Sequence, residues 1–499
     1  MKPANAVLRR QMVDLELQLA MREEELREAR RAVYEAQAEI ATLQTELDAI
    51  VYHVETLPAE LLSLIFRFMR YEDAHGLELP RCSPQPLLAV CRAWRQVALA
   101  SSELWTHVAV NIATPRLPLP TDLSERLVAW LARAGERPLC LAIRGPSVDE
   151  AFAIDHFEPL LRRFSPQLKQ LMLQNMSEED MDAVDAWPQL SFPILEDADL
   201  HLFYREDPDS EDTLYMDRLL SDAPRLRTYK LANIDPAEEW PWPNLTHLTL
   251  RGRTWVKDCA TALSQLPLLV SLTAQGHFYD SPDPVAVVHA ALQELHLETE
   301  SEFEVWEYMS AFTLPALRIL DLGRALVPED EENEAGTAVL AFLDRSQPPL
   351  RELALCADDF PFLAEIVSRC NLTHLTLETP SKTLVRDFFA AYRAHTEFCP
   401  ALQSLSFVLR DTESFEDFDP EHAKISDFVR CAGKSIKWRR DATGASFVLR
   451  SFRVTRIQPT SFTSHMHFDS EQLRVFRELK ASGMEILLDV KENGQGSIV

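Results

Sequence analysis

One short phrase, Leu-x-x-Leu-x-Leu, returns along most of the sequence and constrains the fold more than any other feature. A proline usually precedes it, as in Pro243-Asn-Leu-Thr-His-Leu-Thr-Leu250. Successive copies begin between 19 residues (Leu226 to Leu245) and 33 residues (Leu317 to Leu350) apart. Clear copies cover residues 166–173, 224–231, 243–250, 291–297, 315–322, 349–355, 371–377 and 400–407, and looser copies cover 193–200 and 267–272.

Each copy predicts a β-strand with one buried side, because leucines two residues apart point to the same face of a strand. The segments before several copies, such as 260–266, 338–343 and 362–367, are apolar and predict helices. A single strand and helix cannot bury this apolar surface alone, so neighbouring units must stack side by side. We therefore expect an α/β solenoid over residues 111–420, with parallel strands on the concave face and helices on the convex face.

These units resemble leucine-rich repeats, which have about 20–29 residues each. The resemblance implies an architecture and not a ligand. From about Glu421 the pattern changes to a helix, two strands within 446–457, a helix over 470–481 and a strand over 485–490. We interpret residues 421–499 as a capping unit that covers the last repeat.

The first fifty residues carry a heptad pattern in which apolar or small residues recur at alternating steps of four and three. The stripe runs from Leu8 to Ile50, and only Arg22 breaks it. Residues 1–52 are therefore predicted to form a helix long enough for a two-helix coiled coil.

A homodimer through this helix is one interpretation of the stripe. With Met12 at heptad position a, Glu25 of one chain and Arg30 of the other would meet in a parallel dimer. The alternative is a lone amphipathic helix that lies on the solenoid.

Residues 53–110 predict a compact helical segment. Pro58 suits the first turn of a helix, where its missing N–H costs nothing. A polar loop over 71–86 separates this helix from a second one over 87–98. The buried stripe of the second helix would be Leu87, Val90, Cys91, Trp94 and Val97.

This segment resembles the F-box. The motif is specific as a combination and stands in this sequence as Leu57, Pro58, Glu60, Leu61, Leu62, Ile65 and Phe66, then Val90, Cys91, Trp94 and Arg95, then Leu104 and Trp105. The whole layout is similar to F-box proteins with a coiled helix and leucine-rich repeats that are abundant in mushroom-forming fungi.

The resemblance implies a substrate-recognition adaptor of an SCF (Skp–cullin–F-box) type ubiquitin ligase. Such an adaptor is not an enzyme, because it only raises the effective concentration of a substrate lysine near the ubiquitin-charged enzyme. The alternative is a coiled-coil and leucine-rich-repeat interaction scaffold without ligase association, which the long loop after Arg70 motivates. The contacts to the Skp linker, and through it to cullin, that the resemblance implies are Leu57, Pro58, Glu60, Leu61, Leu62, Ile65, Phe66, Val90, Cys91 and Trp94.

Three tryptophan and valine positions have a second interpretation. Val90, Trp94 and Trp105 are better assigned to the packing of the box itself, and Trp94 suits either role. The other contacts are needed less for packing, since a segment of about fifty residues has too small a core to use all of them.

The concave face of the solenoid is expected to bind an unknown protein substrate. The side chains that flank the second leucine of a copy, and the one after the third, point away from the core. A basic or neutral recognition element suits this mixed, somewhat acidic surface better than a phosphorylated one. The substrate-binding candidates are His247, Thr249, Arg251, Glu294, His296, Glu298, Glu352, His374, Thr376 and Glu378.

Composition excludes several other classes of function. The net charge of −28 disfavours nucleic acid and an anionic membrane as partners. The eight cysteines form no CxxC pair and no apolar run is long enough for a signal or a bilayer span, so we expect a cytoplasmic or nuclear protein with reduced thiols.

No motif for an enzyme, a cofactor or a metal site is present. His465 and His467 are interpreted as a surface pair rather than metal ligands, since no Cys or carboxylate completes a set. The basic group Lys437, Arg439 and Arg440 is interpreted as a solvated turn.

Overall fold

The chain divides into two units, one with residues 1–74 and 82–104 and the other with residues 75–81 and 105–499. We call them the helical unit and the repeat unit. The structure is a computed structural model, and it describes residues 2–50, 57–69, 84–112, 123–145, 154–202, 218–234, 239–252, 254–276, 278–279, 286–299, 308–323, 334–357, 359–410, 425–457 and 470–489. His465 and His467 lie outside these residues.

The helical unit begins with the single helix α1 (Lys2–Ile50), which confirms the long helix predicted from the heptad pattern. No glycine interrupts it, and Pro3 stands in the first turn, where proline is tolerated. The side chains of residues 12–46 are all exposed.

Three short helices follow in this unit: α2 (Ala59–Met69), α3 (Gln85–Val90) and α4 (Arg92–Ala100). The prediction of one helix over 87–98 is wrong, because the chain is extended at Cys91 (φ −153°, ψ 174°). The Trp94 backbone N–H donates to Cys91 Sγ at 3.4 Å, so Cys91 begins α4 instead of continuing α3. The break leaves Val90 58% exposed rather than on a buried stripe.

The repeat unit is built on one long parallel sheet. In the described part of the chain this sheet has 14 strands in sequence order. Four minor strands stand outside it: β7 (Thr254–Trp255), β9 (Phe278–Tyr279), β10 (Val287–Val288) and β12 (Phe312–Thr313). The strands are β1 (His107–Asn111), β2 (Leu139–Arg144), β3 (Leu168–Met176), β4 (Asp197–Leu202), β5 (Thr228–Ala232), β6 (His247–Arg251), β8 (Ser271–Gly276), β11 (Glu294–Thr299), β13 (Ile319–Asp321), β14 (Glu352–Cys356), β15 (His374–Glu378), β16 (Ser404–Arg410), β17 (Ser451–Ile457) and β18 (Glu485–Asp489).

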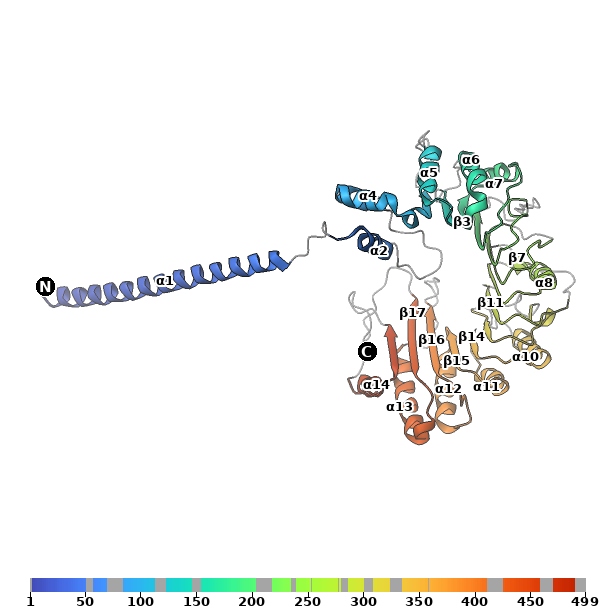
Figure 1. The fold of residues 1–499 in the computed structure, drawn as a ribbon. Helices are drawn as coiled ribbons and strands as arrows, with labels where there is room; N and C mark the ends of the chain where they lie inside the picture. Colours follow the sequence, from blue (N-terminus) through green and yellow to red (C-terminus); the bar gives the residue numbers. More distant parts are fainter. Residues whose placement is uncertain are drawn as a thin grey trace. The chain divides into compact units, whose positions relative to one another are not determined.

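Every predicted repeat phrase, clear or loose, contributes a strand to this sheet. The helices between the strands lie on the outer side of the curved sheet, and the strands line its inner side (Figure 1). A leucine-rich-repeat-like α/β solenoid is therefore confirmed. The helices are α5 (Leu123–Leu131), α6 (Glu158–Phe164), α7 (Glu178–Asp185), α8 (Val256–Gln265), α10 (Glu334–Ser346), α11 (Phe360–Arg369), α12 (Lys382–Ala394), α13 (Ile425–Thr443) and α14 (Ser470–Ala481).

The repeat leucines form continuous buried rows across the strands. Leu248 of β6 lies in register with Leu272 of β8, which in turn aligns with Leu295 of β11. All three side chains are at most 1% exposed. Alternate residues on each strand therefore fill the space between sheet and helices, as the period of two predicts.

The turns after several strands need left-handed backbone. Gly252 follows β6 with φ +94°, and a Cβ there would lie 2.2 Å from Asn233 Oδ1. Asn233 itself has φ 58°, and its side-chain amide donates to the Leu202 carbonyl at 3.0 Å. The Asn233 side chain thus links the turn after β5 to the end of β4.

The N-terminal edge of the sheet begins within the segment that the sequence assigns to the box. Strand β1 pairs with β2 from His107 onward. Trp105 belongs to the repeat unit, where its ring packs edge-on against Trp130 at 4.7 Å between centroids. This contact links Trp105 to the first repeat, and its assignment to the packing of the box stays a prediction.

The C-terminal segment continues the sheet. The two strands predicted within 446–457 are one strand, β17, which pairs in parallel with β16 and then with β18. Strands β17 and β18 thus extend the parallel sheet, and Phe452 and Val454 continue the buried rows of the repeats. The assignment of residues 421–499 as a capping unit stays a prediction.

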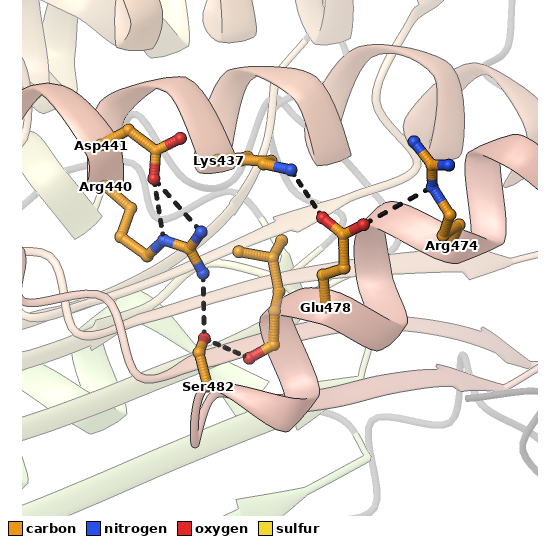
Figure 2. A network of polar contacts seen from close by, with 7 residues as sticks. Lys437, Arg440, Asp441, Arg474, Glu478 and Ser482 are labelled. Carbon is orange, nitrogen blue, oxygen red and sulfur yellow. Dashed lines mark hydrogen bonds and ion pairs between the residues drawn. The ribbon is translucent and has the colours of Figure 1, made fainter.

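Polar contacts join the last two helices. Figure 2 shows Lys437 of α13 with its Nζ 2.5 Å from a carboxylate oxygen of Glu478 on α14, which Arg474 also approaches. Arg440 donates to Ser482 Oγ at 3.0 Å (Figure 2). Lys437, Arg439 and Arg440 all lie on helix α13, so the prediction that this basic group forms a solvated turn is wrong.

Arg439, between them in sequence, is only 4% exposed. Its guanidinium donates to the backbone carbonyls of Tyr392 (2.9 Å) and Thr396 (2.7 Å). It also stacks 4.0 Å from the Tyr392 ring centroid. A buried cation is tolerated here because these acceptors replace water, so Arg439 is a structural residue that fastens α13 to the end of α12.

Candidate binding surfaces

Helix α2 is apolar on two different faces. Leu62 and Phe66, four residues apart, are at most 1% exposed. Leu61, Leu64, Ile65 and Phe68 form a second stripe with the spacing i, i+3, i+4 and i+7. Their exposed fractions are 47%, 45%, 42% and 71%, so this stripe is open, and we call it the α2 apolar stripe.

The inner face of α2 is held by other residues of the helical unit. The Phe66 ring lies 5.0 Å from the Trp94 ring on α4, at an interplanar angle of 60°. The hydroxyls of Ser63 and Ser101 are 2.9 Å apart. These contacts fix the rotation of α2, and the α2 apolar stripe stays exposed as a consequence.

The predicted linker contacts divide between these two faces. Pro58, Glu60, Leu61, Ile65 and Val90 are exposed, whereas Leu57, Cys91 and Trp94 are half-buried. Leu62 and Phe66 are buried, so they are not accessible as the sequence interpretation requires.

Three exposed apolar residues were missed by the sequence interpretation. Leu64 and Phe68 belong to the α2 apolar stripe, and Leu99 on α4 is 42% exposed. The signal was present, since α2 carries apolar residues at more positions than one helical face can hold. It was missed because the family motif quotes neither position.

The concave face of the repeat unit carries rows of polar side chains between the buried leucine rows. Gln170 Nε2 of β3 donates to Asp197 Oδ2 of β4 at 2.8 Å. Further along the same strand, Arg144 Nη2 donates to Gln174 Oε1 at 2.7 Å, and Gln174 Nε2 donates to Asp199 Oδ2 at 2.8 Å. Side chains on neighbouring strands thus order one another across the face.

The substrate-binding candidates mostly lie where the strand period predicts. His247, Arg251 and His374 are exposed, whereas Thr249, Glu294, His296, Glu352 and Thr376 are half-buried. Glu298 lies on β11, but its side chain is outside the described set. Glu378 is only 7% exposed, so the expectation that it is accessible is wrong. Its neighbours in register, Cys356 and Val408, cover it on both sides.

Charge is distributed unevenly along this face. Strands β2 to β6 carry the cations Arg144, Lys230 and Arg251. Strands β11 to β15 carry acidic residues, in part next to histidines: His296 Nδ1 is 3.4 Å from Asp321 Oδ2, and His374 Nδ1 is 3.6 Å from Glu352 Oε1. The sequence showed a mixed surface. In the sheet, strands β2 to β6 combine these cations with Asp197 and Asp199 of β4, whereas strands β11 to β15 carry acidic residues and histidines.

Burial changes the ionisation of two side chains on strands β4 and β5. Desolvation lowers the pKa of His201 on β4, and the nearby cations Arg251 and Arg144 lower it further, against the opposing effect of Asp199. Desolvation also lowers the pKa of Lys230, again opposed by Asp199. The side chains on the concave face around Asp199 are therefore partly desolvated.

Buried thiols of the repeat unit are poor nucleophiles. Burial raises the pKa values of Cys259 and Cys399 to about 12 each. Among the described residues, no group of three His, Cys, Asp or Glu side chains is placed to hold a metal ion. Within the same residues, no helix combines the length and apolarity needed to cross a bilayer.

Comparison with known families assigns the segment that contains α2, α3 and α4. Residues 54–111 match the family model described as F-box-like. The chain therefore contains an F-box-like domain followed by the parallel-stranded solenoid. A search of curated proteins finds no match to this chain.

Proposed function

We propose that this protein is a substrate-recognition adaptor of an SCF-type ubiquitin ligase. The F-box-like domain would bind the Skp linker, and through it cullin, while the repeat unit binds the protein to be ubiquitinated. The α2 apolar stripe is the observation that carries the proposal. A helix that leaves four large apolar side chains open in a row is typical of a protein-binding site.

The contact surface differs from the one that the sequence motif implies. Leu61, Leu64, Ile65 and Phe68 would enter the linker interface, since they are accessible. Leu62, Phe66 and Trp94 would orient that face from within. Val90, which is 58% exposed, would extend the surface from the end of α3.

The test is capture of a purified Skp linker by the full-length chain. Aspartate at both Leu61 and Ile65 places two charges in the proposed interface, and we expect capture to be lost. Leu268→Asp in the repeat unit is the matched control, because Leu268 is 51% exposed against 47% for Leu61. Capture that survives the double substitution would refute the docking surface and favour a scaffold without ligase association.

For the substrate, we propose a basic or neutral recognition element that binds the concave face at strands β11 to β15. Glu294, Asp321 and Glu352 lie on neighbouring strands there, since β11 pairs with β13 and β13 with β14. The adaptor would work in the cytoplasm or the nucleus. Proximity labelling should lose substrates when Glu294 and Glu352 are both lysine, while linker capture persists; unchanged substrates would contradict this location.

A further inference from the structure

The long helix α1 leaves its apolar stripe exposed over residues 12–46, the part whose side chains the structure describes. Leu19, Leu26, Val33 and Ile40 occupy heptad position a, and their exposed fractions lie between 52% and 61%. A stripe sustained over several heptads requires a partner helix. The identity and direction of that partner follow from the residues that the stripe would place in contact.

A parallel pair of identical helices matches this stripe poorly. It would place Arg22 opposite Arg22 of a second copy at position d, two like charges inside the seam. It would also place Ala29 opposite Ala29 and Ala36 opposite Ala36, which leaves two thin layers in succession. Glu25, which a parallel dimer would pair with Arg30, already binds Arg22 of its own helix at 2.8 Å.

We propose that α1 forms an antiparallel homodimer in which Leu26 of one copy packs against Ala29 of the other. In the same register, each of the layers that fit a parallel pair poorly, at Arg22, Ala29 and Ala36, faces an apolar residue of the other copy. Ala36 then faces Leu19, and Arg22 faces Val33, away from Arg22 of the second copy. The remaining described layers pair Met12 with Leu43 and Leu15 with Ile40.

Charges along the edges of the seam select this register. Antiparallel helices bring e positions together, so Glu23 of each copy meets Arg30 of the other. Within the described part of the chain, neither Glu23 nor Arg30 has an ion pair or hydrogen bond of its own, whereas Glu24 and Arg27 pair with each other at 2.7 Å. Both charges are therefore available to a second copy.

Neighbouring antiparallel registers are disfavoured. Sliding the helices by one heptad in one direction brings Glu23 opposite Glu23 of the second copy. Sliding them in the other direction brings Arg30 opposite Arg30. Like charges at these positions repel, so the proposed register is the one that satisfies both the seam and its edges.

The direction of pairing determines what the dimer can do. At 1.5 Å per residue, the ends of the two α1 helices at Ile50 would lie about 70 Å apart in this register. A parallel dimer would hold them side by side. The antiparallel dimer would therefore carry its two F-box-like domains far apart, as a bivalent adaptor able to engage two sites at once.

Thiol cross-linking tests the direction. Met12→Cys and Leu43→Cys chains, each full length and separately tagged, are treated with a short bismaleimide alone and as a mixture. We expect a link between residues 12 and 43 only in the mixture, identified by peptide mapping. The unsubstituted chain, with its own eight cysteines, sets the background. Links from 12 to 12 or from 43 to 43, or no link at all, would overturn the proposal.

Charge exchange tests the register independently. We expect Glu23→Arg to weaken the dimer about tenfold in sedimentation, because two attractions become two repulsions. Adding Arg30→Glu should restore the wild-type dissociation constant. Exchange of Glu24 and Arg27, which pair within one helix, is the matched control and should change little. A monomeric wild-type chain, or a double variant that is not restored, would contradict the proposed register.

Discussion

Helices α2 and α12 use similar apolar residues in opposite ways. In α12 the residues Leu384, Val385, Phe388, Phe389 and Tyr392 are all at most 2% exposed. Among the large apolar side chains that the structure describes in α2, two are buried and four remain exposed. The repeat helix α12 buries these apolar side chains within its own unit, whereas α2 leaves one of its two apolar faces exposed.

The difference follows from what each helix packs against. Helix α12 lies within a stack where the next repeat always supplies a partner, and Phe388 meets Phe389, Tyr392, Phe398 and Phe407. Within the described residues, α2 packs against α4 of its own unit through Phe66 and Trp94. A unit of this size cannot bury two faces of one helix.

The largest effect is expected at the centre of the α12 cluster. Phe388→Ala should lower the free energy of unfolding by about 3–5 kcal/mol, since it leaves a cavity among four aromatic rings. Trp438→Ala is the control in the same unit, because Trp438 is 47% exposed, and it should cost less than about 1 kcal/mol. Urea unfolding of the two variants measures the difference. Equal effects would mean that the repeat interior is not tightly packed.

A second pair of substitutions separates the two faces of α2. Phe66→Ala removes the ring that packs on Trp94 and should destabilise the helical unit by about 3 kcal/mol. Phe68→Ala removes a ring that is 71% exposed, so stability should stay within about 0.5 kcal/mol of wild type.

Linker capture should depend on the exposed ring of Phe68, although stability does not. Phe68→Ala should weaken capture about tenfold or more while the domain stays folded, if this ring is an interface anchor. Hydrogen exchange of the helical unit and a linker titration supply the two measurements. If Phe68→Ala binds the linker as tightly as the wild-type chain, Phe68 is not part of the interface. The exposed face of α2 would then differ less from the buried face of α12 in function.

The same contrast explains which structural features the sequence predicted. A strand period of two has one buried side, so the leucine rows, the strand order and the concave positions could be predicted. Helix α2 has apolar residues around most of its circumference, so no period told which face lies inside. The family motif then favoured Leu62 and Phe66 as contacts, although they form the interior.

Other differences needed three-dimensional partners. The break at Cys91 depends on a local hydrogen bond of its thiol, which composition does not show. The role of Arg439 depends on carbonyls more than forty residues away in sequence. The burial of Glu378 depends on the strands on either side of it. In each case the deciding contact is remote or conformational, and the local sequence is compatible with either outcome.

The smallest predicted effect concerns His201 on the concave face, whose side chain is half-buried. Burial and the cations Arg251 and Arg144 lower its folded-state pKa below the ordinary 6.5, and Asp199 opposes them. The unfolded chain therefore binds a proton more readily, and stability falls as the pH drops from 6.5 through the lower folded-state pKa. His201→Gln should remove this part of the pH dependence.

Urea midpoints at pH 7.5 and pH 5.5 measure the effect in both proteins. Carboxylates that titrate in the same range act equally in both, so the difference between the two pH dependences isolates His201. If His201→Gln leaves the pH dependence unchanged, the concave face around Asp199 is as well hydrated as the α2 apolar stripe. The repeat unit would then withdraw only its leucine rows from water, and the contrast with the box would be confined to apolar residues.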